Sequence, residues 1–592
     1  MNHRLAVRLA AVSAGAVLVG GVFLLRAPAA RACGCFTPPD PTVPIVQAGE
    51  RIAFQVDDGV VTAHIQIQYK GAAEEFGWLL PLPSVPTLEV GTDELFGQLI
   101  QQTQPRYSLV VEYEGDCAFN SAGSSDDGAG DSDSGDGPAP PESEDPLIVQ
   151  GSIGPYDYAV LSADSKDPML GWLGDNGFFV PAGTDEAVDP YIRPGAYFLA
   201  LKLRKGNDVG DIQPVVVKYA SDLPMIPIVL TGVAADPDMP VMVWVLGEDR
   251  AIPRNYFHTE INDAEIDWFS FGANYIDVIT RAVDEADEHQ SFVTEYAGDS
   301  AIMLDLLDYP SRFGDLDELR SNTDAVNYVE YLSSTGYTAA SFSPGSFSAT
   351  FTSQTLAVLA RHLPVPAALA EYLTNQGLTT SDYYFGIRYY VDELSKQQPE
   401  LFEDLDLEFD PIELTNELEE RVVVPTLAAG ELFRKNSYMT RLFTTMSADE
   451  MTRDPVFSFN PDLPDVSNVH QGRVVYHCGL ISEDSPNTTP ATLFTEDGWE
   501  LAFPDGVGVN PWTSINWPLS RFIQVEREEG ASEVVVDNSD AIAQVIADNT
   551  EPFPRRGDDD GCAAGGGSGA AGGLAVGGLA LLLGLRRRRR RG

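Results

Sequence analysis

The chain has 592 residues, of which 44% are hydrophobic and 10% aromatic, with 53 Gly and 41 Pro. This length predicts two to four domains or one large body with insertions, and the apolar fraction excludes disorder over the full length. The 37 basic and 89 acidic residues give a formal net charge of −52. Such an acidic body repels nucleic acid and anionic lipid surfaces, and this repulsion disfavours both as its ligands.

The first 32 residues predict a secretory signal peptide. A basic start precedes an apolar run from 9 to 25, and Ala30-Arg31-Ala32 supplies a small-residue cleavage pattern before Cys33. An uncleaved signal anchor and a lipoprotein signal are the alternatives to cleavage after Ala32. In each case the segment directs the body out of the cytoplasm.

The hairpin pattern that opens the body predicts strands at 52–56 and 60–69 around Asp57-Asp58-Gly59. Alternation in the second strand places His64 on a polar, exposed face. Thr92 is predicted to cap a helix that ends near residue 102. The same reasoning predicts further strands at 107–114, 147–161, 196–204, 212–219, 226–230 and 239–246, and a short helix at 169–178.

From about residue 270 the pattern becomes helical, and one late segment, 472–477, has the pattern of a strand. The predicted helices are 275–288, 315–332, 354–362, 381–394 and 427–445. Strands followed by helices predict an α+β fold, with an N-terminal antiparallel β-rich half and a more helical half in one or two packed domains. The predicted segments of the exported body are 33–115 and 147–268, both β-rich, and 269–550, which is helix-rich and mixed.

Residues 116–146 are predicted to form a disordered acidic insertion, because Gly, Ser, Pro, Asp and Glu cannot bury enough apolar surface to offset the entropy of ordering. Asp131, Asp133 and Glu142 match positions 1, 3 and 12 of a calcium loop, but position 6 is Asp136 where that loop requires glycine. A solvated insertion is therefore favoured over a calcium loop and over a diffuse cation-attracting loop.

Four cysteines fall in the exported body, namely Cys33, Cys35, Cys117 and Cys478. An even number in an oxidising compartment predicts two disulfides, with three possible connectivities. A metal site on these thiols is the alternative, but Cys33-Gly34-Cys35 lacks the paired C-x-x-C spacing of structural zinc sites. No histidine cluster and no cofactor-binding motif is apparent, so neither a metal nor a cofactor is predicted.

The C-terminal segment 551–592 predicts a linker followed by a surface anchor. Cys562 precedes the uncharged residues 563–585, which can just span a bilayer as a helix, and the arginine block 586–591 then stays cytoplasmic. This order resembles the myxobacterial C-terminal sorting signals of the MYXO-CTERM class. The resemblance implies that Cys562 is the residue of processing or lipid attachment. An ordinary single-pass anchor is the alternative, with the same topology.

Three stretches of the body resemble a family of exported bacterial proteins, the domain of unknown function numbered 2330. They are Ala32–Phe36 with Gly49–Phe54, Ile65–Gly71 with Phe76–Ser84, and Thr440–Met451 with Asp454–Phe457 and Asn460–Asp462. The resemblance covers about residues 33–480. It implies a secreted body with an N-terminal cysteine cluster and implies no activity.

No short catalytic motif is present, since the sequence lacks G-x-S-x-G, H-E-x-x-H, the P-loop and G-x-G-x-x-G. Ser300 and the adjacent His477-Cys478 are the candidates for nucleophilic chemistry, and export favours a disulfide for Cys478. The sequence thus favours a cell-surface binding or structural protein. The alternative is a surface hydrolase, which requires His64 or His258 beside a carboxylate and a hydroxyl in a cleft. The predicted partners are the export and sorting machinery at both termini and the membrane at the C-terminal segment.

Overall fold

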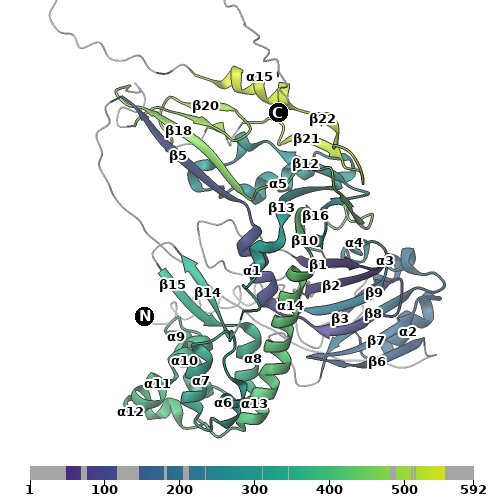
Figure 1. Ribbon diagram of the computed structural model, residues 1–592, viewed down its shortest axis with the longest axis vertical. Coiled ribbons are helices and arrows are strands. Elements are labelled where there is room, and N and C mark those ends of the chain that lie inside the picture. Colours follow the sequence, from purple (N-terminus) through teal and green to yellow (C-terminus); the bar gives the residue numbers. More distant parts are fainter. Residues whose placement is uncertain are drawn as a thin grey trace, which may run out of the picture.

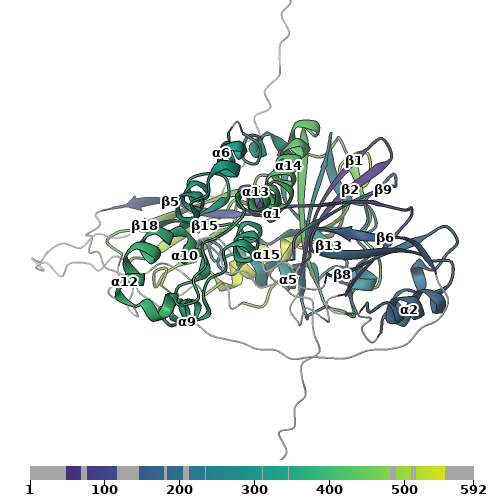
Figure 2. The same cartoon turned by 90° about the horizontal axis from the view of Figure 1, so that it is seen from below.

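The computed structural model describes residues 49–67, 77–115, 146–178, 183–204, 212–233, 235–309, 311–343, 346–480, 488–508, 511–512, 515–551 and 553. Strands and helices are both abundant, so the predicted α+β class is confirmed. Figure 1 shows a lobe of helices, with the small sheet of β14 (Thr338–Ser343) and β15 (Ser346–Phe351) on it, beside the larger sheets. Figure 2 shows that lobe and the strands β6 (Leu147–Ile153) and β8 (Tyr197–Leu203) on opposite sides of the molecule.

A mixed ten-stranded sheet forms the centre of the molecule, in the order β22-β21-β12-β13-β16-β10-β1-β2-β9-β4. The pairs β1–β10 and β12–β13 are parallel and the remaining pairs are antiparallel. Its strands are β1 (Glu50–Asp57), β2 (Val60–Ile67), β4 (Thr87–Val90), β9 (Val215–Ala220), β10 (Met239–Gly247), β12 (Phe257–Ile261), β13 (Ser291–Asp299), β16 (Tyr438–Met446), β21 (Ser520–Val525) and β22 (Glu533–Asp537). Strands from both halves of the chain thus share one sheet.

Four smaller sheets surround this centre. One has the order β3-β8-β7-β6 and another the order β20-β19-β18-β5, and two hairpin-sized sheets pair β11 with β17 and β14 with β15. The strands are β3 (Gly77–Leu82), β5 (Arg106–Glu114), β6 (Leu147–Ile153), β7 (Tyr156–Ser162), β8 (Tyr197–Leu203), β11 (Arg250–Pro253), β14 (Thr338–Ser343), β15 (Ser346–Phe351), β17 (Phe457–Asn460), β18 (Val469–His477), β19 (Ala491–Phe494) and β20 (Glu500–Phe503).

Helices α1, α5 and α14 cover the central sheet, and α2 packs against strands β7 and β8 of the smaller sheet. Helices α6 to α13 form the lobe, whose own core includes Tyr328, Tyr383 and Tyr384. A π-helical turn at Glu419–Val423 joins α13 to α14. The helices are α1 (Asp93–Thr103), α2 (Lys166–Asp175), α3 (Thr184–Ala187), α4 (Ile228–Thr231), α5 (Tyr275–Val283), α6 (Leu316–Ser321), α7 (Ala325–Ser333), α8 (Ser353–His362), α9 (Ala367–Asn375), α10 (Thr380–Phe385), α11 (Ile387–Tyr389), α12 (Ser395–Gln397), α13 (Pro411–Leu418), α14 (Val424–Lys435) and α15 (Ser539–Asn549).

The central sheet is covered on both faces. On one face Phe54 and Val61 pack against side chains of the β3-β8-β7-β6 sheet such as Leu199. On the other face Ala53 and Trp244 pack in a second core with residues of α1, α5 and α14. Because burial on both faces removes the need for polar alternation, the central strand β10 has an uninterrupted apolar sequence, MPVMVWVLG.

The first hairpin and the first helix form as predicted. Asp58 and Gly59 have φ angles of 47° and 74°, the left-handed pair that a two-residue hairpin turn requires. Thr92 caps α1 by accepting a hydrogen bond from the backbone N–H of Glu94. Two acidic residues, Asp93 and Glu94, occupy the first turn of the helix, where its dipole favours them.

The exposed position predicted for His64 is wrong, because the side chain is only 6% exposed. His64 lies directly opposite Ala53 in the β1–β2 register, so both side chains share the face that α1 covers. Burial lowers the pKa of His64 to about 4, and the imidazole is neutral at pH 7.

Four further predictions about elements need correction. The predicted strand 226–230 is instead the one-turn helix α4, and the predicted helix 427–445 ends at Lys435 and gives way to β16. The predicted strand 147–161 is the β6–β7 hairpin, and the predicted helix 315–332 is α6 followed by α7. Strand β16 lies between β10 and β13 and eight of its nine residues are buried, so it carries no period-2 pattern that distinguishes it from a helix.

The predicted signal peptide and the C-terminal segment beyond residue 553 lie outside the described residues, and so do the insertion 116–145 and the cysteines other than Cys478. Within the described ranges, every helix is too short or too polar to cross a bilayer. The predicted span at 563–585 lies outside these ranges.

Candidate functional site

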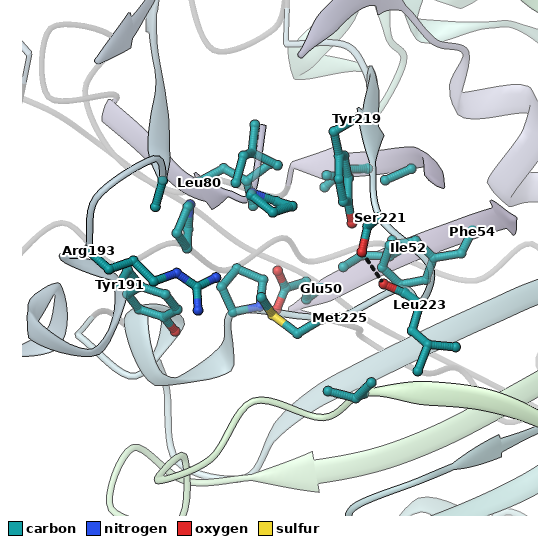
Figure 3. A pocket seen from close by; sticks show the side chains of 18 residues that line it. Glu50, Ile52, Phe54, Leu80, Tyr191, Arg193, Tyr219, Ser221, Leu223 and Met225 are labelled. Atoms are coloured by element: carbon teal, nitrogen blue, oxygen red, sulfur yellow. Dashed lines mark hydrogen bonds between the residues drawn. The ribbon is translucent and has the colours of Figure 1, made fainter. Parts of the chain in front are cut away.

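A cavity of about 300 Å³ lies between the central sheet and strand β3, close to the β9–α4 connection (Figure 3). Most of its wall is apolar. The lining residues are Glu50, Ile52, Phe54, Ala63, Ile65, Leu80, Pro81, Leu82, Pro83, Tyr191, Arg193, Ala196, Tyr219, Ser221, Leu223, Met225, Pro227 and Val456. Its size is at the lower end of the range for small-molecule sites in proteins.

Strand periodicity explains the position of this wall. Glu50, Ile52 and Phe54 are spaced two residues apart in β1, so their side chains point to the same face of the sheet. Ala63 and Ile65 of β2 add to that face, since Ala63 is the partner of Phe54 and Ile65 the partner of Ile52. The strand therefore places one carboxyl group at the end of a row of apolar side chains.

The cavity has a polar end formed by Glu50 and Arg193. Burial raises the pKa of Glu50 to about 7, and the Thr231 hydroxyl lies 3.5 Å from one of its carboxylate oxygens. Arg193 is exposed, and its guanidinium points in Figure 3 toward the side of the cavity where Glu50 lies. The exposed positive charge of Arg193 thus lies at the same end of the cavity as the carboxyl group of Glu50, which changes between its neutral and ionised forms near pH 7.

Asp454 supports the same end of the cavity from behind. Its Oδ1 accepts hydrogen bonds from the Tyr191 hydroxyl at 2.8 Å and from the Val229 backbone N–H at 3.1 Å. Burial nevertheless raises the pKa of Asp454, and its charge contributes to the raised pKa of Glu50. The charge of Asp454 thus adds to burial in disfavouring the ionised form of Glu50.

The lining lacks a pair that could perform nucleophilic catalysis. None of the described lining residues is a histidine or a cysteine, and the Ser221 hydroxyl donates to the Leu223 carbonyl oxygen at 2.9 Å. An apolar wall with one charged end is suited to binding a small molecule.

The nucleophile candidates from the sequence lie elsewhere. Ser300 is 1% exposed and its hydroxyl donates to the carbonyl of Asn436, so it is not available for attack. His477 contacts Glu114 and Thr492, each at 2.8 Å. Cys478, the one cysteine among the described residues, is disulfide-bonded, and because its partner lies outside those residues the predicted pairing stays a prediction.

His258 lies beside a hydroxyl and a carboxylate, but in the protein interior. Its Nε2 is 3.0 Å from the Thr294 hydroxyl and its Nδ1 is 3.8 Å from a carboxylate oxygen of Glu526, which also pairs with Arg250 at 3.0 Å. The side chains are at most 7% exposed, and burial lowers the pKa of His258. None of these side chains lines the cavity described above.

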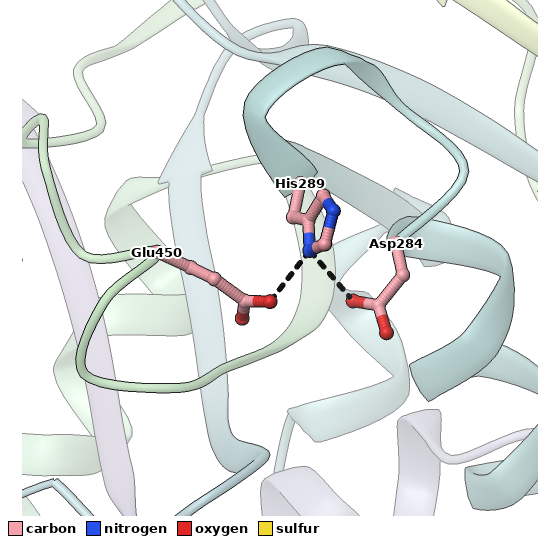
Figure 4. A group of neighbouring side chains, drawn as sticks. All are labelled: Asp284, His289 and Glu450. Carbon is pink, nitrogen blue, oxygen red and sulfur yellow. Dashed lines mark hydrogen bonds and ion pairs between the residues drawn. The ribbon is translucent and has the colours of Figure 1, made fainter.

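A second group of side chains has the composition of a metal site. Asp284, His289 and Glu450 each offer one ligand atom, and these atoms lie within 4.8 Å of one another (Figure 4). No sequence pattern predicts this group, because Glu450 is 161 residues from His289 along the chain. No local motif signals such a pairing.

Comparison with known proteins identifies one family. A family model described as an uncharacterized protein conserved in bacteria (DUF2330) matches residues 27–342. The first two stretches named in the sequence analysis fall within that match, and the third, Thr440–Asp462, lies beyond it. No curated protein and no solved structure matches the chain.

Proposed function

Because the chain belongs to the DUF2330 family of uncharacterized bacterial proteins, we propose that it is an exported surface protein that binds a small amphipathic molecule. The apolar cavity at β1, β2 and β3 is the observation that carries this proposal. The ligand has an apolar body, which contacts the wall around Phe54 and Ile65, and an anionic head, which pairs with Arg193.

The choice of an anionic head follows from the charges at the polar end. Arg193 is a permanent cation, and guanidinium groups pair well with carboxylates. Glu50 opposes an anion only when it is ionised, and its pKa of about 7 leaves it largely protonated in mildly acidic solution. A long-chain carboxylic acid has this combination of properties.

A displacement assay tests the proposal on the full chain. Anilinonaphthalene sulfonate, which has an aromatic body and an anionic head, should bind with saturable fluorescence, and straight-chain carboxylates should displace it. Arg193→Gln should weaken binding roughly tenfold, the loss of about 1.4 kcal/mol of charge-assisted contact. Arg204→Gln is the matched control, because Arg204 is also an exposed arginine but does not line the cavity.

A second variant fills the cavity itself. Ala63→Met places a longer side chain in the wall at a cost in stability of about 1–3 kcal/mol, so folding is checked by circular dichroism. Loss of dye binding in the folded variant supports the proposed site. Unchanged dye binding by both Ala63→Met and Arg193→Gln would mean that the dye binds elsewhere, and this result would refute the proposed site.

We also propose that the body is held at the cell surface by its C-terminal segment. The support is the order of Cys562, the uncharged segment 563–585 and the arginine block in the sequence. Intact-mass measurement of the protein from its native membrane should show a chain that begins at Cys33 and lacks everything after Cys562. A mass that includes the arginine block would leave an ordinary membrane span as the anchor.

For the disulfides, we propose that Cys117 is the partner of Cys478. The Cys478 backbone N–H donates to the Glu114 carbonyl oxygen at 2.8 Å, and a Cβ atom at Gly115 would lie 3.6 Å from the Cβ of Cys478. The chain therefore passes Cys478 two residues before it reaches Cys117. Peptide mapping without reduction should recover these two cysteines in one linked pair, and a link from Cys478 to Cys33 or Cys35 would contradict the assignment.

A further inference from the structure

The group formed by Asp284, His289 and Glu450 lies where two connections between secondary-structure elements meet. Nδ1 of His289 is 2.6 Å from Oε1 of Glu450 and 3.8 Å from Oδ1 of Asp284. The side chains are partly open to solvent, with exposed fractions of 47% for His289, 37% for Asp284 and 16% for Glu450. An ion could therefore reach all three donors.

The backbone holds each donor in place. Asp284 caps the C-terminal end of α5, and His289 follows in the α5–β13 connection, where Glu288 and His289 both have a φ of 56°. Glu450 lies in the β16–β17 connection and accepts a hydrogen bond from the Ser447 backbone N–H at 2.7 Å through Oε2. That bond leaves Oε1 of Glu450 facing His289, as Figure 4 shows.

The local charge balance also favours a cation. In the described part of the chain, Asp284 and Glu450 form ion pairs with His289 and with no lysine or arginine. Two more acidic residues, Asp238 and Asp449, add negative potential at the group. The nearby Arg453 is paired with Glu288 at 3.2 Å.

We propose that Asp284, His289 and Glu450 form a binding site for one divalent transition-metal ion of the Zn²⁺ type. Zn²⁺ takes nitrogen and oxygen ligands at about 2.0–2.2 Å in a tetrahedral arrangement, which places the ligand atoms roughly 3.3 Å apart. The observed separations of 2.6 and 3.8 Å lie on either side of that value. Small side-chain rotations therefore suffice to form the site.

The donor types select among the metals. Imidazole favours Zn²⁺ and its neighbours in the first transition row, whereas Mg²⁺ and Ca²⁺ prefer an all-oxygen shell. Three protein ligands leave one position open to water or to a further ligand. On binding, Nδ1 of His289 gives up its proton to solvent and donates its lone pair to the ion.

Calorimetric titration of the full-length chain, without a histidine tag and in 0.15 M salt, tests the site with ZnCl₂ as the probe. One zinc ion per chain should bind with a higher affinity than the weak, diffuse binding that is expected of an acidic protein. His289→Gln, and separately Asp284→Asn with Glu450→Gln, should weaken that equivalent at least tenfold. Calcium chloride should bind more weakly than zinc at the same position.

The matched control is His470→Gln. His470 forms a similar imidazole–carboxylate contact, 2.8 Å from Glu496, but belongs to no described group of three donors. It should leave zinc affinity and stoichiometry unchanged, and so should neutralising Asp131, Asp133 and Glu142 in the acidic insertion. The proposal is overturned if the wild type binds no tight equivalent, if His289→Gln binds like the wild type, or if His470→Gln loses as much affinity. Circular dichroism confirms that each variant is folded.

Discussion

Glu50 should make the stability of the fold depend on pH. Its carboxyl pKa is about 7 in the folded chain, against 4.5 as its ordinary value, and burial is the main cause. Between these two values the folded chain keeps a proton that the unfolded chain has released. The contribution of Glu50 to stability is therefore full below pH 4.5 and is lost as pH rises through 7.

The size of this effect follows from the shift. Each pKa unit corresponds to 1.36 kcal/mol, so a rise from 4.5 to about 7 costs at most about 3 kcal/mol at pH 8. Glu50 is partly open to solvent in the cavity, so a value nearer 2 kcal/mol is expected. Glu50→Gln removes the titrating group and keeps the side chain close to its original size.

Urea unfolding of the wild type and of Glu50→Gln at pH 5 and pH 8 measures the difference. The variant should be less than about 1 kcal/mol more stable than the wild type at pH 5 and about 2 kcal/mol more stable at pH 8. Glu248→Gln is the control, because Glu248 is exposed, and it should change the stability by the same small amount at both values. A constant difference between Glu50→Gln and the wild type across this range would refute the reasoning.

Three further sites test a buried ion pair and the backbone conformation at two glycines. Arg441 is fully buried and its Nε lies 2.5 Å from a carboxylate oxygen of Glu295, so Glu295→Gln removes its counter-charge and should lower the free energy of unfolding by about 3–5 kcal/mol. The double variant Arg441→Met with Glu295→Leu should recover most of that loss. A loss below about 1 kcal/mol in the single variant would contradict the pairing. Gly59→Ala, at a φ of 74°, should cost about 1 kcal/mol in a urea titration, and a gain there would exclude the left-handed turn. Gly97→Ala, in the same assay, should instead stabilise α1 by about 0.5–1 kcal/mol, since a Cβ atom there meets no other atom within 4 Å.

Local chemistry made some elements predictable from the sequence. The hairpin at Asp58-Gly59 and the cap at Thr92 depend on backbone conformations and hydrogen bonds within a few residues, and both occur as predicted. The predicted exposure of His64 is wrong because distant parts of the chain determine which face of its strand is covered. His64 alternates as an exposed residue does, but α1 and the rest of the second core cover that face.

Neither candidate site could be predicted from the sequence, because each combines residues that are far apart along the chain. The cavity wall combines β1 with residues as distant as Val456, and the metal-type group combines the α5–β13 and β16–β17 connections. No spacing rule relates residues that meet only through a ten-stranded sheet with crossovers. The raised pKa of Glu50 also depends on burial of its carboxyl group, and this burial cannot be predicted from the sequence of the strand.

The β16–β17 connection links the two sites, because it supplies Glu450 to the metal-type group and Asp454 to the polar end of the cavity. Met451 is 3% exposed and anchors the segment in the core between these two acids. Asn255 then fixes its far end, donating to the Asp454 carbonyl oxygen at 2.8 Å and accepting from the Val456 backbone N–H at 2.7 Å. A segment held at both ends and in the middle positions its two carboxylates before any ligand arrives, which lowers the entropy that binding must overcome. A displacement of this connection would therefore alter the donors of both sites together.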